Sequence, residues 1–251
     1  MAASSKDLIV GGLHAACTTL ERAAGDVLEM WLRRDRDDGP LAALARDARA
    51  QGVTVQFVEP ATLARLYGDE HHQGVVVRRR PPATVELDTV LARATAAGRA
   101  PLLLVLDNVQ DPRNFGACLR VADGAGVDGV VFTRDRSARL TSVVAKTASG
   151  ALDSVALVSV PNLAAALKAL AAAGVWTLGA ALEDAVPLWE ADLTLPSALV
   201  LGNEGEGLRR LTRERCDRLV RIPMHGAVAS LNVATAAAVC LFEACRQRAA
   251  G

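Results

Sequence analysis

Three glycines in the stretch DGAGVDGVVF (residues 123–132) have the spacing of a dinucleotide-binding turn. Gly124, Gly126 and Gly129 satisfy the pattern G-x-G-x-x-G, which suits a nicotinamide cofactor when a strand precedes the glycines and a helix follows them. Here the order is reversed, because apolar residues at helical spacing come first and a β-branched run comes after. The pattern therefore predicts a helix end and a tight turn into a strand, where glycine tolerates positive φ.

Three longer stretches, each directly after a strand-like run, carry polar residues that could form a site. They are DNVQDPRNFGACLR (residues 107–120), LGNEGEGL (201–208) and IPMHGAVASLNVA (222–234). Each is richer in glycine and polar side chains than an ordinary turn requires. Since ligands gather beyond the carboxyl ends of the strands of a parallel sheet, three such loops at one edge predict a binding or catalytic site.

The elements that must position these loops alternate along the second part of the chain. Helical periodicity marks residues 162–174 and 230–248. Strand-like runs lie at residues 100–108, 128–133, 155–160, 174–180, 196–203 and 218–224. This alternation predicts an α/β fold with a mostly parallel sheet that is covered on both faces.

A smaller α/β region precedes a break in composition at VVVRRRPPATVELD (residues 75–88), where an apolar run meets three arginines and two prolines. The expected domains are an N-terminal domain at 1–78, a linker with the first helix at 79–98, and a second domain at 99–251. Arg78, Arg79 and Arg80 have two interpretations that the sequence leaves open: they bind phosphate, or they keep the linker solvated. The strand-like runs of the first domain are 26–34, 52–59 and 74–80, and its helical segments are 39–51 and 60–68.

Composition narrows the class of protein. The 28 basic and 28 acidic side chains give no net charge, so RNA binding would need a local basic patch. A signal peptide and a run of membrane-spanning length are both missing from the pattern, which predicts a cytoplasmic protein with no membrane partner. The five cysteines contain no C-x-x-C pair and the histidines lack ligand spacing, so we expect reduced thiols and no structural metal.

The three polar loops resemble motifs 1, 2 and 3 of the SpoU, or TrmH-like, family of RNA 2'-O-ribose methyltransferases within the SPOUT superfamily. The resemblance covers residues 100–248 in the order and spacing of the family, while GGLHAACTTLER and HHQGVVV resemble the N-terminal RNA-binding domain of its rRNA guanosine methyltransferase branch. It implies S-adenosylmethionine as methyl donor, a homodimer, and a SPOUT-type parallel sheet with a C-terminal trefoil knot, preceded by a small α/β RNA-binding domain. Periodicity alone would not predict a knot.

The resemblance also assigns site residues. Around the target ribose it places Asn114, Arg120, Glu204, Ser230 and Asn232, and against the cofactor it places Gly202, Ile222 and Leu231. Ser230 is also expected to cap the helix that follows it, with Asn232 just inside that helix. Asp107 and Asn108 are interpreted as the end of their strand, and Phe115 as a core residue.

Methyl transfer from a sulfonium to a ribose hydroxyl needs two reactants in contact and a group that handles the hydroxyl proton. The Arg120 guanidinium stays protonated under ordinary conditions, so we interpret it as a clamp for RNA phosphate and for the developing alkoxide. The proton acceptor remains open between Glu204 and an RNA phosphate oxygen. The terminal segment 230–248 is apolar on more than one face, so we expect one side on its own sheet and the other at a dimer interface.

Several functions fit these residues to different degrees. The favoured one is 2'-O-methylation of a ribose in RNA, at a guanosine of 23S rRNA. A tRNA 2'-O-methyltransferase or an rRNA resistance methyltransferase of the same family is the alternative. An NAD-dependent oxidoreductase is remote because of the reversed order around Gly124, Gly126 and Gly129. A catalytically silent RNA-binding protein is disfavoured by the complete set of motif residues.

Overall fold

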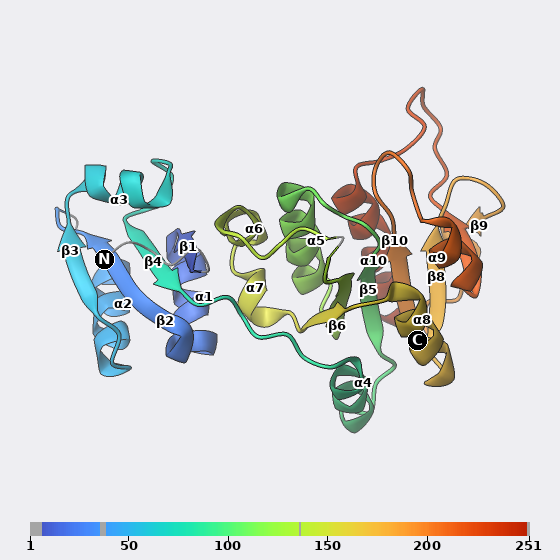
Figure 1. The fold of residues 1–251 in the computed structure, drawn as a ribbon, viewed down its shortest axis with the longest axis horizontal. Helices are drawn as coiled ribbons and strands as arrows, with labels where there is room; N and C mark the ends of the chain where they lie inside the picture. Colours follow the sequence, from blue (N-terminus) through green and yellow to red (C-terminus); the bar gives the residue numbers. More distant parts are fainter. Residues whose placement is uncertain (1–6, 36–38, 136, 250–251) are drawn as a thin grey trace. The chain divides into compact units, whose positions relative to one another are not determined.

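The computed structural model describes residues 7–35, 39–135 and 137–249, and its contacts divide the chain into two units (Figure 1). Unit 1 comprises Met1–Ala83 and Leu140–Ser154, and unit 2 comprises Thr84–Arg139 and Val155–Gly251. The two units have separate sheets, which are described one at a time below. Among the described residues, no helix has the length and apolar character needed to cross a bilayer.

The sheet of unit 1 has four strands in the order β1-β4-β2-β3. β2 and β3 are parallel, and the other neighbours are antiparallel. Val75, Val76 and Val77 are fully buried in β4, as expected for a β-branched run in a central strand. The strands are β1 (Leu8–Gly11), β2 (Val27–Arg33), β3 (Val55–Val58) and β4 (Val75–Arg79). β2, β3 and β4 confirm the predicted runs, whereas β1 was not predicted.

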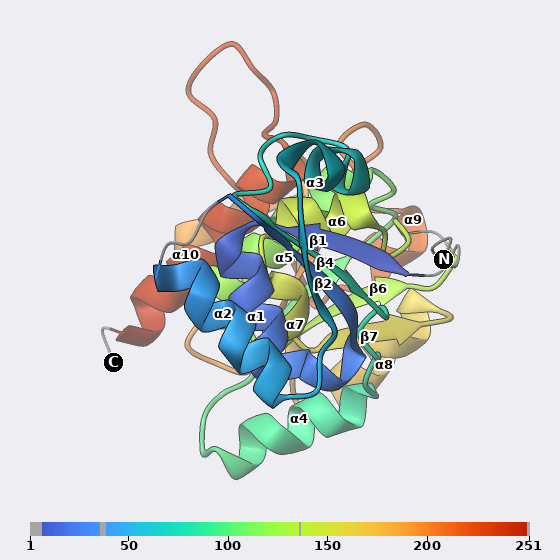
Figure 2. The same cartoon turned by 90° about the vertical axis from the view of Figure 1, so that its left-hand side faces the viewer.

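The helices of unit 1 come from two parts of the sequence. α1 and α2 contact each other and lie side by side in Figure 2. From the first part come α1 (Leu13–Ala23), the short 3-10 helix η1 (Ala24–Asp26), α2 (Gly39–Ala50) and α3 (Pro60–Tyr67), and from the second come α6 (Ser142–Ala148) and α7 (Ala151–Ser154). α6 packs on β1 and α7 packs on α1.

Residues 140–154, here called the inserted segment, therefore belong to unit 1 although the sequence around them belongs to unit 2. The Ile9 backbone N–H donates to Ser142 Oγ at 2.8 Å, and Lys146 Nζ donates to Asp69 Oδ2 at 2.5 Å. The expected division at 1–78, 79–98 and 99–251 placed this segment in the second domain. A division along the sequence cannot capture it, because its partners lie far away in the chain.

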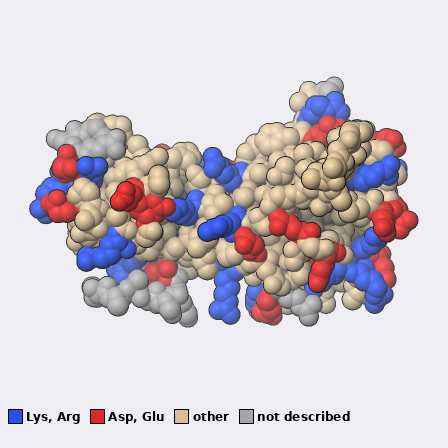
Figure 3. Space-filling view, turned by 90° about the horizontal axis from the view of Figure 1, so that it is seen from above, with Lys and Arg blue, Asp and Glu red and all other residues tan. Residues whose placement is uncertain are grey.

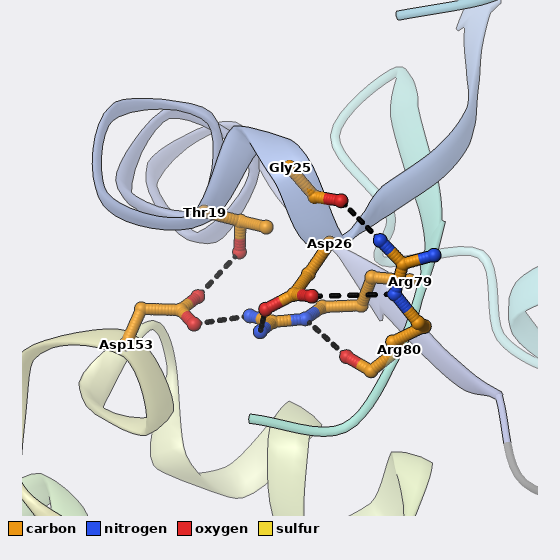
Figure 4. Close-up of polar contacts among 6 residues, drawn as sticks. All are labelled: Thr19, Gly25, Asp26, Arg79, Arg80 and Asp153. Carbon is orange, nitrogen blue, oxygen red and sulfur yellow. Dashed lines mark hydrogen bonds and ion pairs between the residues drawn. The ribbon is translucent and has the colours of Figure 1, made fainter. Parts of the chain in front are cut away.

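The sequence left two interpretations of the three consecutive arginines, as phosphate ligands or as part of a solvated linker. Neither describes Arg78 and Arg79, which are the last two residues of β4. Figure 4 shows the surroundings of Arg79 and Arg80. The Arg79 side chain is only 1% exposed and donates from Nη1 to Asp153 Oδ1 of the inserted segment. Arg78 forms ion pairs with Glu29 at 3.0 Å and with Asp7 at 3.8 Å. Arg80 is half exposed and lies 3.3 Å from Asp26. Strand pairing carries these side chains into unit 1, where carboxylates neutralise them.

The sheet of unit 2 has seven strands in the order β7-β6-β5-β10-β8-β11-β9, and every neighbouring pair is parallel. All residues of the three strands β5, β6 and β10 are buried. The strands are β5 (Leu102–Leu106), β6 (Gly129–Thr133), β7 (Leu157–Val160), β8 (Trp176–Ala180), β9 (Val186–Pro187), β10 (Ser197–Leu201) and β11 (Arg218–Arg221). The predicted parallel sheet is confirmed, with β9 as an addition.

Both faces of this sheet are covered. Leu103 and Val105 pack with residues of α4 and α8 in one apolar cluster. Leu104 and Leu106 alternate with them and point to the opposite face of the sheet. The rings of Phe115 of α5 and Phe132 of β6 pack edge to face, with 5.1 Å between their centroids. α10 packs along both α5 and β10. The helices are α4 (Leu87–Ala96), α5 (Pro112–Gly124), α8 (Leu163–Ala172), α9 (Arg210–Arg215) and α10 (Val233–Ala249), with the short 3-10 helix η2 (Leu188–Glu190).

The glycine pattern at the end of α5 has the predicted structure. Gly124 is the last residue of the helix, Gly126 has φ of 65°, and Gly129 opens β6. A Cβ at Gly129 would lie 3.1 Å from Val90 Cγ1, which is tighter than ordinary contact. These glycines therefore serve a helix-to-strand turn and do not precede a helix N-terminus that could face a pyrophosphate.

Candidate active site at the carboxyl edge of the large sheet

A cavity of about 390 Å³ lies beyond the carboxyl ends of β8, β10 and β11 in unit 2. Three loops supply most of its wall, and they follow these three strands in turn. The residues that the sequence placed at the site and that line this cavity are Gly202, Glu204, Ser230, Ile222 and Leu231. The position agrees with the rule that parallel sheets bind ligands at their carboxyl edge.

The loop after β10 is a tight hairpin turn that requires glycine. Asn203 and Gly207 exchange two backbone hydrogen bonds, at 3.1 and 2.8 Å, and Gly207 has φ of 66°. A Cβ at Gly202 would lie 2.1 Å from the carbonyl group of Gly207. Any side chain at Gly202 would thus open the turn that carries Glu204.

Three polar side chains, from the stretches after β5, β10 and β11, meet in one cluster, here called the Glu204 cluster. Asn114 Nδ2 donates to Glu204 Oε1 at 2.9 Å, and Asn232 Nδ2 donates both to Glu204 Oε1 and, at 3.0 Å, to Asn114 Oδ1. The Val233 backbone N–H also donates to Glu204 Oε1, at 3.3 Å. Glu204 Oε2 has no hydrogen-bond partner within the described ranges, so this oxygen is free to accept a proton or a donor from a ligand.

Helix caps fix the two asparagines. Asp111 Oδ1 accepts from the backbone N–H groups of Arg113 and Asn114 at 2.8 and 2.9 Å, which starts α5 beside the cluster. Asn232 Oδ1 accepts from Ala234 N–H at 2.9 Å and so caps α10. The expectation that Ser230 caps this helix is wrong, because α10 begins three residues later, at Val233.

Arg120 lies exposed on α5. Its spacing from Asn114 corresponds to a rise of about 9 Å along the helix. Among the described residues, its guanidinium has neither a hydrogen bond nor an ion pair. The structure therefore brings Asn114, Glu204 and Asn232 together and leaves Arg120 available to a partner outside the chain.

Asp107 is a structural residue of the site that the sequence analysis interpreted only as a strand end. It is fully buried, and its carboxylate accepts from the Arg209 backbone N–H at 3.0 Å and from Arg209 Nε at 2.6 Å. This pair joins the loop after β5 to the residues that follow the hairpin at 203–207. A charged residue inside a predicted buried strand end was the available signal, since a buried carboxylate needs a partner.

Thiol chemistry does not suit this region. Burial, and secondarily the charge of Glu204, raises the pKa of the Cys118 thiol to about 12. Burial likewise raises the pKa of Cys240 to about 12, so both thiols stay protonated near neutral pH. Over the described ranges, no group of three or more His, Cys, Asp or Glu side chains is arranged to hold a metal ion.

Two families match this chain. Residues 101–242 match the SpoU rRNA Methylase family, and residues 9–85 match a family described as RNA 2'-O ribose methyltransferase substrate binding. The first match covers most of unit 2 together with the inserted segment, and the second ends close to the boundary of unit 1 at Ala83. The three loops of the cavity and the Glu204 cluster all fall in the first match.

Similar proteins extend over nearly the whole chain. A 23S rRNA (guanosine-2'-O-)-methyltransferase RlmB of Shewanella oneidensis is 45% identical over 246 residues, which cover 97% of this chain and 98% of that protein. The protein of the same description from Yersinia pestis is 45% identical over 240 residues, covering 96% of this chain and 97% of its own length.

Solved structures of SpoU methyltransferases also resemble this chain, and they differ in how much of it they match. The SpoU methyltransferase AviRb of Streptomyces viridochromogenes, in complex with AdoMet, aligns with a TM-score of 0.81 and 28% identity over 98% of this chain and 92% of its own. The A. aeolicus TrmH/SpoU tRNA modifying enzyme aligns with a TM-score of 0.55 and 29% identity, over 65% of this chain and 85% of its own. The tRNA enzyme thus matches only part of the present chain.

Proposed function

The chain belongs to the SpoU rRNA methylase family, and on that premise we propose that it transfers a methyl group from S-adenosylmethionine to the 2'-hydroxyl of a guanosine ribose in 23S rRNA. The observation that carries the proposal is the position of Glu204. This residue lines the cavity beyond β8, β10 and β11, and its side chain accepts hydrogen bonds from Asn114 and Asn232. Glu204 therefore belongs both to the cavity proposed for the methyl donor and to a polar cluster that could hold the ribose hydroxyl group.

The residues of the cavity fit the methyl donor. Gly202, Ile222 and Leu231 present backbone and apolar groups suited to a neutral adenosine. The cavity is also lined by charged residues of both signs, the acidic Glu183, Glu204 and Glu206 and the basic Arg213 and Arg221. This mixture suits a ligand that carries a sulfonium, an ammonium and a carboxylate group. S-adenosylmethionine, when bound, supplies a methyl group on a positively charged sulfur. We assign Gly202, Ile222 and Leu231 to its binding.

Glu204 is proposed to accept the proton of the ribose hydroxyl. Its Oε1 atom takes the hydrogen bonds from Asn114, Asn232 and Val233, which orient the carboxylate and direct Oε2 to a ligand. An RNA phosphate oxygen is the other candidate for this role. A variant with glutamine at position 204 separates the two, because it keeps the hydrogen-bond geometry and removes the basic oxygen.

Arg120 and Ser230 are proposed to act on the RNA side. Arg120 is exposed and unpaired within the described chain, so its guanidinium is available to an RNA phosphate and to the charge that develops on the ribose oxygen. Ser230 is exposed, lines the cavity and can donate or accept a hydrogen bond.

We propose rRNA and not tRNA as the substrate because of how much of this chain aligns with each kind of relative. Relatives described as 23S rRNA guanosine methyltransferases align over both units, whereas the tRNA modifying enzyme aligns over 65% of the chain. Unit 1, which contains all but the last two residues of the substrate-binding match at residues 9–85, is therefore proposed to hold rRNA. The chain has no net charge, and basic and acidic side chains are interspersed on the face shown in Figure 3. We therefore propose that the contact depends on local groups and on shape.

Three further features belong to the proposal. A homodimer is supported by α10, which buries residues against α5 and β10 yet leaves Phe242 52% exposed. A trefoil knot is supported by the strand order and by the chain after β11. β10 lies between β5 and β8 although it follows β8 in sequence, and residues in the stretch 222–231 line the same cavity as the loop after β10.

We propose a cytoplasmic location, since a protein that modifies rRNA would act there.

Mapping of 2'-O-methyl groups in a strain that lacks the protein tests the proposed function. We expect one guanosine of 23S rRNA to lose its methyl group and the tRNA pattern to stay unchanged. Loss of a methyl group in tRNA with an intact 23S pattern would assign the tRNA alternative. An unchanged pattern in both RNAs would contradict methyl transfer to either.

A further inference from the structure

One wall of the cavity in unit 2 is a loop that is held by two arginines from other elements of the fold. The loop, residues 181–185, connects β8 to the edge strand β9, and Ala181, Leu182 and Glu183 line the cavity. Arg213 of α9 and Arg221 at the end of β11 line it as well. Three elements that are separate in sequence therefore build this side of the cavity together.

The contacts of Arg213 and Arg221 converge on the loop. Arg213 Nη2 donates to the Glu183 carbonyl oxygen at 3.1 Å and to Asp184 Oδ2 at 2.7 Å. Arg221 Nη1 donates to the Ala185 carbonyl oxygen. Each arginine contacts a backbone carbonyl group of the loop, so the two residues fix the path of the chain and not only the position of a side chain.

The loop has little else to hold it. Ala181 N–H donates to the Val220 carbonyl oxygen at 2.9 Å, but in the described part of the chain the backbone of residues 182–184 has no hydrogen bond apart from that of Arg213. Asp184 has φ of 52°, a left-handed conformation that is unusual for a residue other than glycine. Leu182 is 62% exposed. A wall built in this way depends on its external contacts for its shape.

We infer that Arg213 and Arg221 are positioning residues for the methyl donor, which act by holding the loop 181–185 in the conformation that completes the donor cavity. The inference rests on the proposed function, since it takes S-adenosylmethionine as the ligand. Donor affinity then includes no cost for ordering the loop, because the arginines have ordered it in the free protein. Loss of an arginine transfers that cost to the binding step.

This role differs from a contribution to overall stability. The Arg213–Asp184 ion pair is exposed at 35% and 85% of its two side chains, and exposed pairs add little to the stability of a fold. Removal of Arg213 should therefore leave the thermal unfolding midpoint nearly unchanged while it weakens donor binding. A merely structural residue would show the opposite pattern.

The test compares Arg213→Ala with Arg215→Ala, which removes an exposed arginine of the same short helix that has no ion pair among the described residues. Binding of S-adenosylhomocysteine by calorimetry and amide hydrogen exchange of residues 181–185 are measured on the full-length protein. For Arg213→Ala we expect about tenfold weaker binding and faster exchange of the loop, with kcat at saturating donor within about twofold of wild type. Arg215→Ala should match wild type in all three.

Two further variants locate the contact. Arg213→Lys keeps a hydrogen-bond donor for one of the two acceptors, so it should bind S-adenosylhomocysteine more tightly than Arg213→Ala does. Asn also adopts the left-handed backbone conformation, so Asp184→Asn should lose less affinity than Arg213→Ala. The double variant Arg213→Ala with Asp184→Asn should bind no more weakly than Arg213→Ala alone, because the aspartate acts only through the arginine.

Three outcomes contradict the inference. Unchanged affinity in Arg213→Ala would remove any role in donor binding. Weaker binding without faster exchange of the loop would mean direct contact with the donor. Wild-type protein that binds neither S-adenosylhomocysteine nor S-adenosylmethionine would overturn the proposed function as well, so the two failures are distinguishable.

Discussion

Two polar clusters, one in each unit, are built in the same way and kept in opposite environments. In unit 1, Asp153 accepts from Arg79 and from Thr19 Oγ1, and the Arg79 and Asp153 side chains are 1% and 2% exposed (Figure 4). In unit 2, Glu204 accepts from Asn114 and Asn232 and stays exposed. Each carboxylate joins segments that are far apart in sequence. The two clusters differ in water access and not in how they are built: the buried one joins parts of unit 1, and the exposed one is the cluster that we propose to be reactive.

The buried cluster should dominate stability. Asp153→Ala leaves the Arg79 guanidinium buried without its main partner, and we expect a loss of about 3–5 kcal/mol in the free energy of unfolding. Urea denaturation followed by circular dichroism measures it. Asp26→Ala is the matched control, because Asp26 is 38% exposed and lies 3.8 Å from Arg79 Nη2. A change in Asp153→Ala as small as that in the control would contradict the structural role.

The exposed site should dominate activity. Arg120→Ala is expected to lower kcat about 10²–10³-fold, the range found when one preorganised donor is removed from a developing negative charge. Donor affinity should stay unchanged, since Arg120 is assigned to the RNA side. Arg93→Ala, on the exposed face of α4, serves as control. A collapse of S-adenosylmethionine binding in Arg120→Ala would show that the assigned role is wrong.

Removal of residues 1–83 sharpens the comparison at the level of the units. The remaining chain keeps the inserted segment, whose buried residues Val144, Ala148 and Leu152 lose the partners that unit 1 supplies. We expect binding of a hydrophobic dye to rise. RNA affinity should fall, and the slope of its logarithm against the logarithm of salt concentration should become smaller as phosphate contacts are lost. RNA affinity equal to that of the full chain would place recognition in unit 2 alone.

The smallest effect concerns the stability contribution of Glu204. Glu204→Gln preserves the size of an exposed side chain, so the free energy of unfolding should change by no more than about 0.5 kcal/mol. The same urea titration as for Asp153→Ala gives the value. A loss comparable to that of Asp153→Ala would remove the distinction between the two clusters.

The sequence predicted the parallel sheet and the three loops well, because buried β-branched runs and glycine-rich turns are local signals. It did not predict that Arg78 and Arg79 lie in a strand and form ion pairs, since a run of arginines resembles a solvated linker until its carboxylate partners are known. Asp153 lies 74 residues from Arg79. Asp107 and Arg209 are likewise separated by 102 residues, so no spacing rule connects them.

The Glu204 cluster was predicted in part: its residues were named from the sequence, but their contacts were not. Asn114 and Glu204 are 90 residues apart, and only the resemblance to a family placed both at one ribose. The geometry adds what the motifs did not contain: Asn232 caps α10, and the Glu204 carboxylate uses Oε1 for its three donors. Long-range contacts of this kind depend on the order of the strands, which local patterns leave undetermined.

Complementation of a strain that lacks the protein tests the central claim most directly, namely that the exposed Glu204 cluster performs 2'-O-methylation of 23S rRNA. Wild-type protein and Glu204→Gln are expressed at equal levels, and 2'-O-methyl groups are mapped across 23S rRNA. The account predicts that wild type restores one methylated guanosine and that Glu204→Gln, although folded and able to bind S-adenosylhomocysteine, does not. Full restoration by Glu204→Gln would contradict the assignment of Glu204 as the proton acceptor.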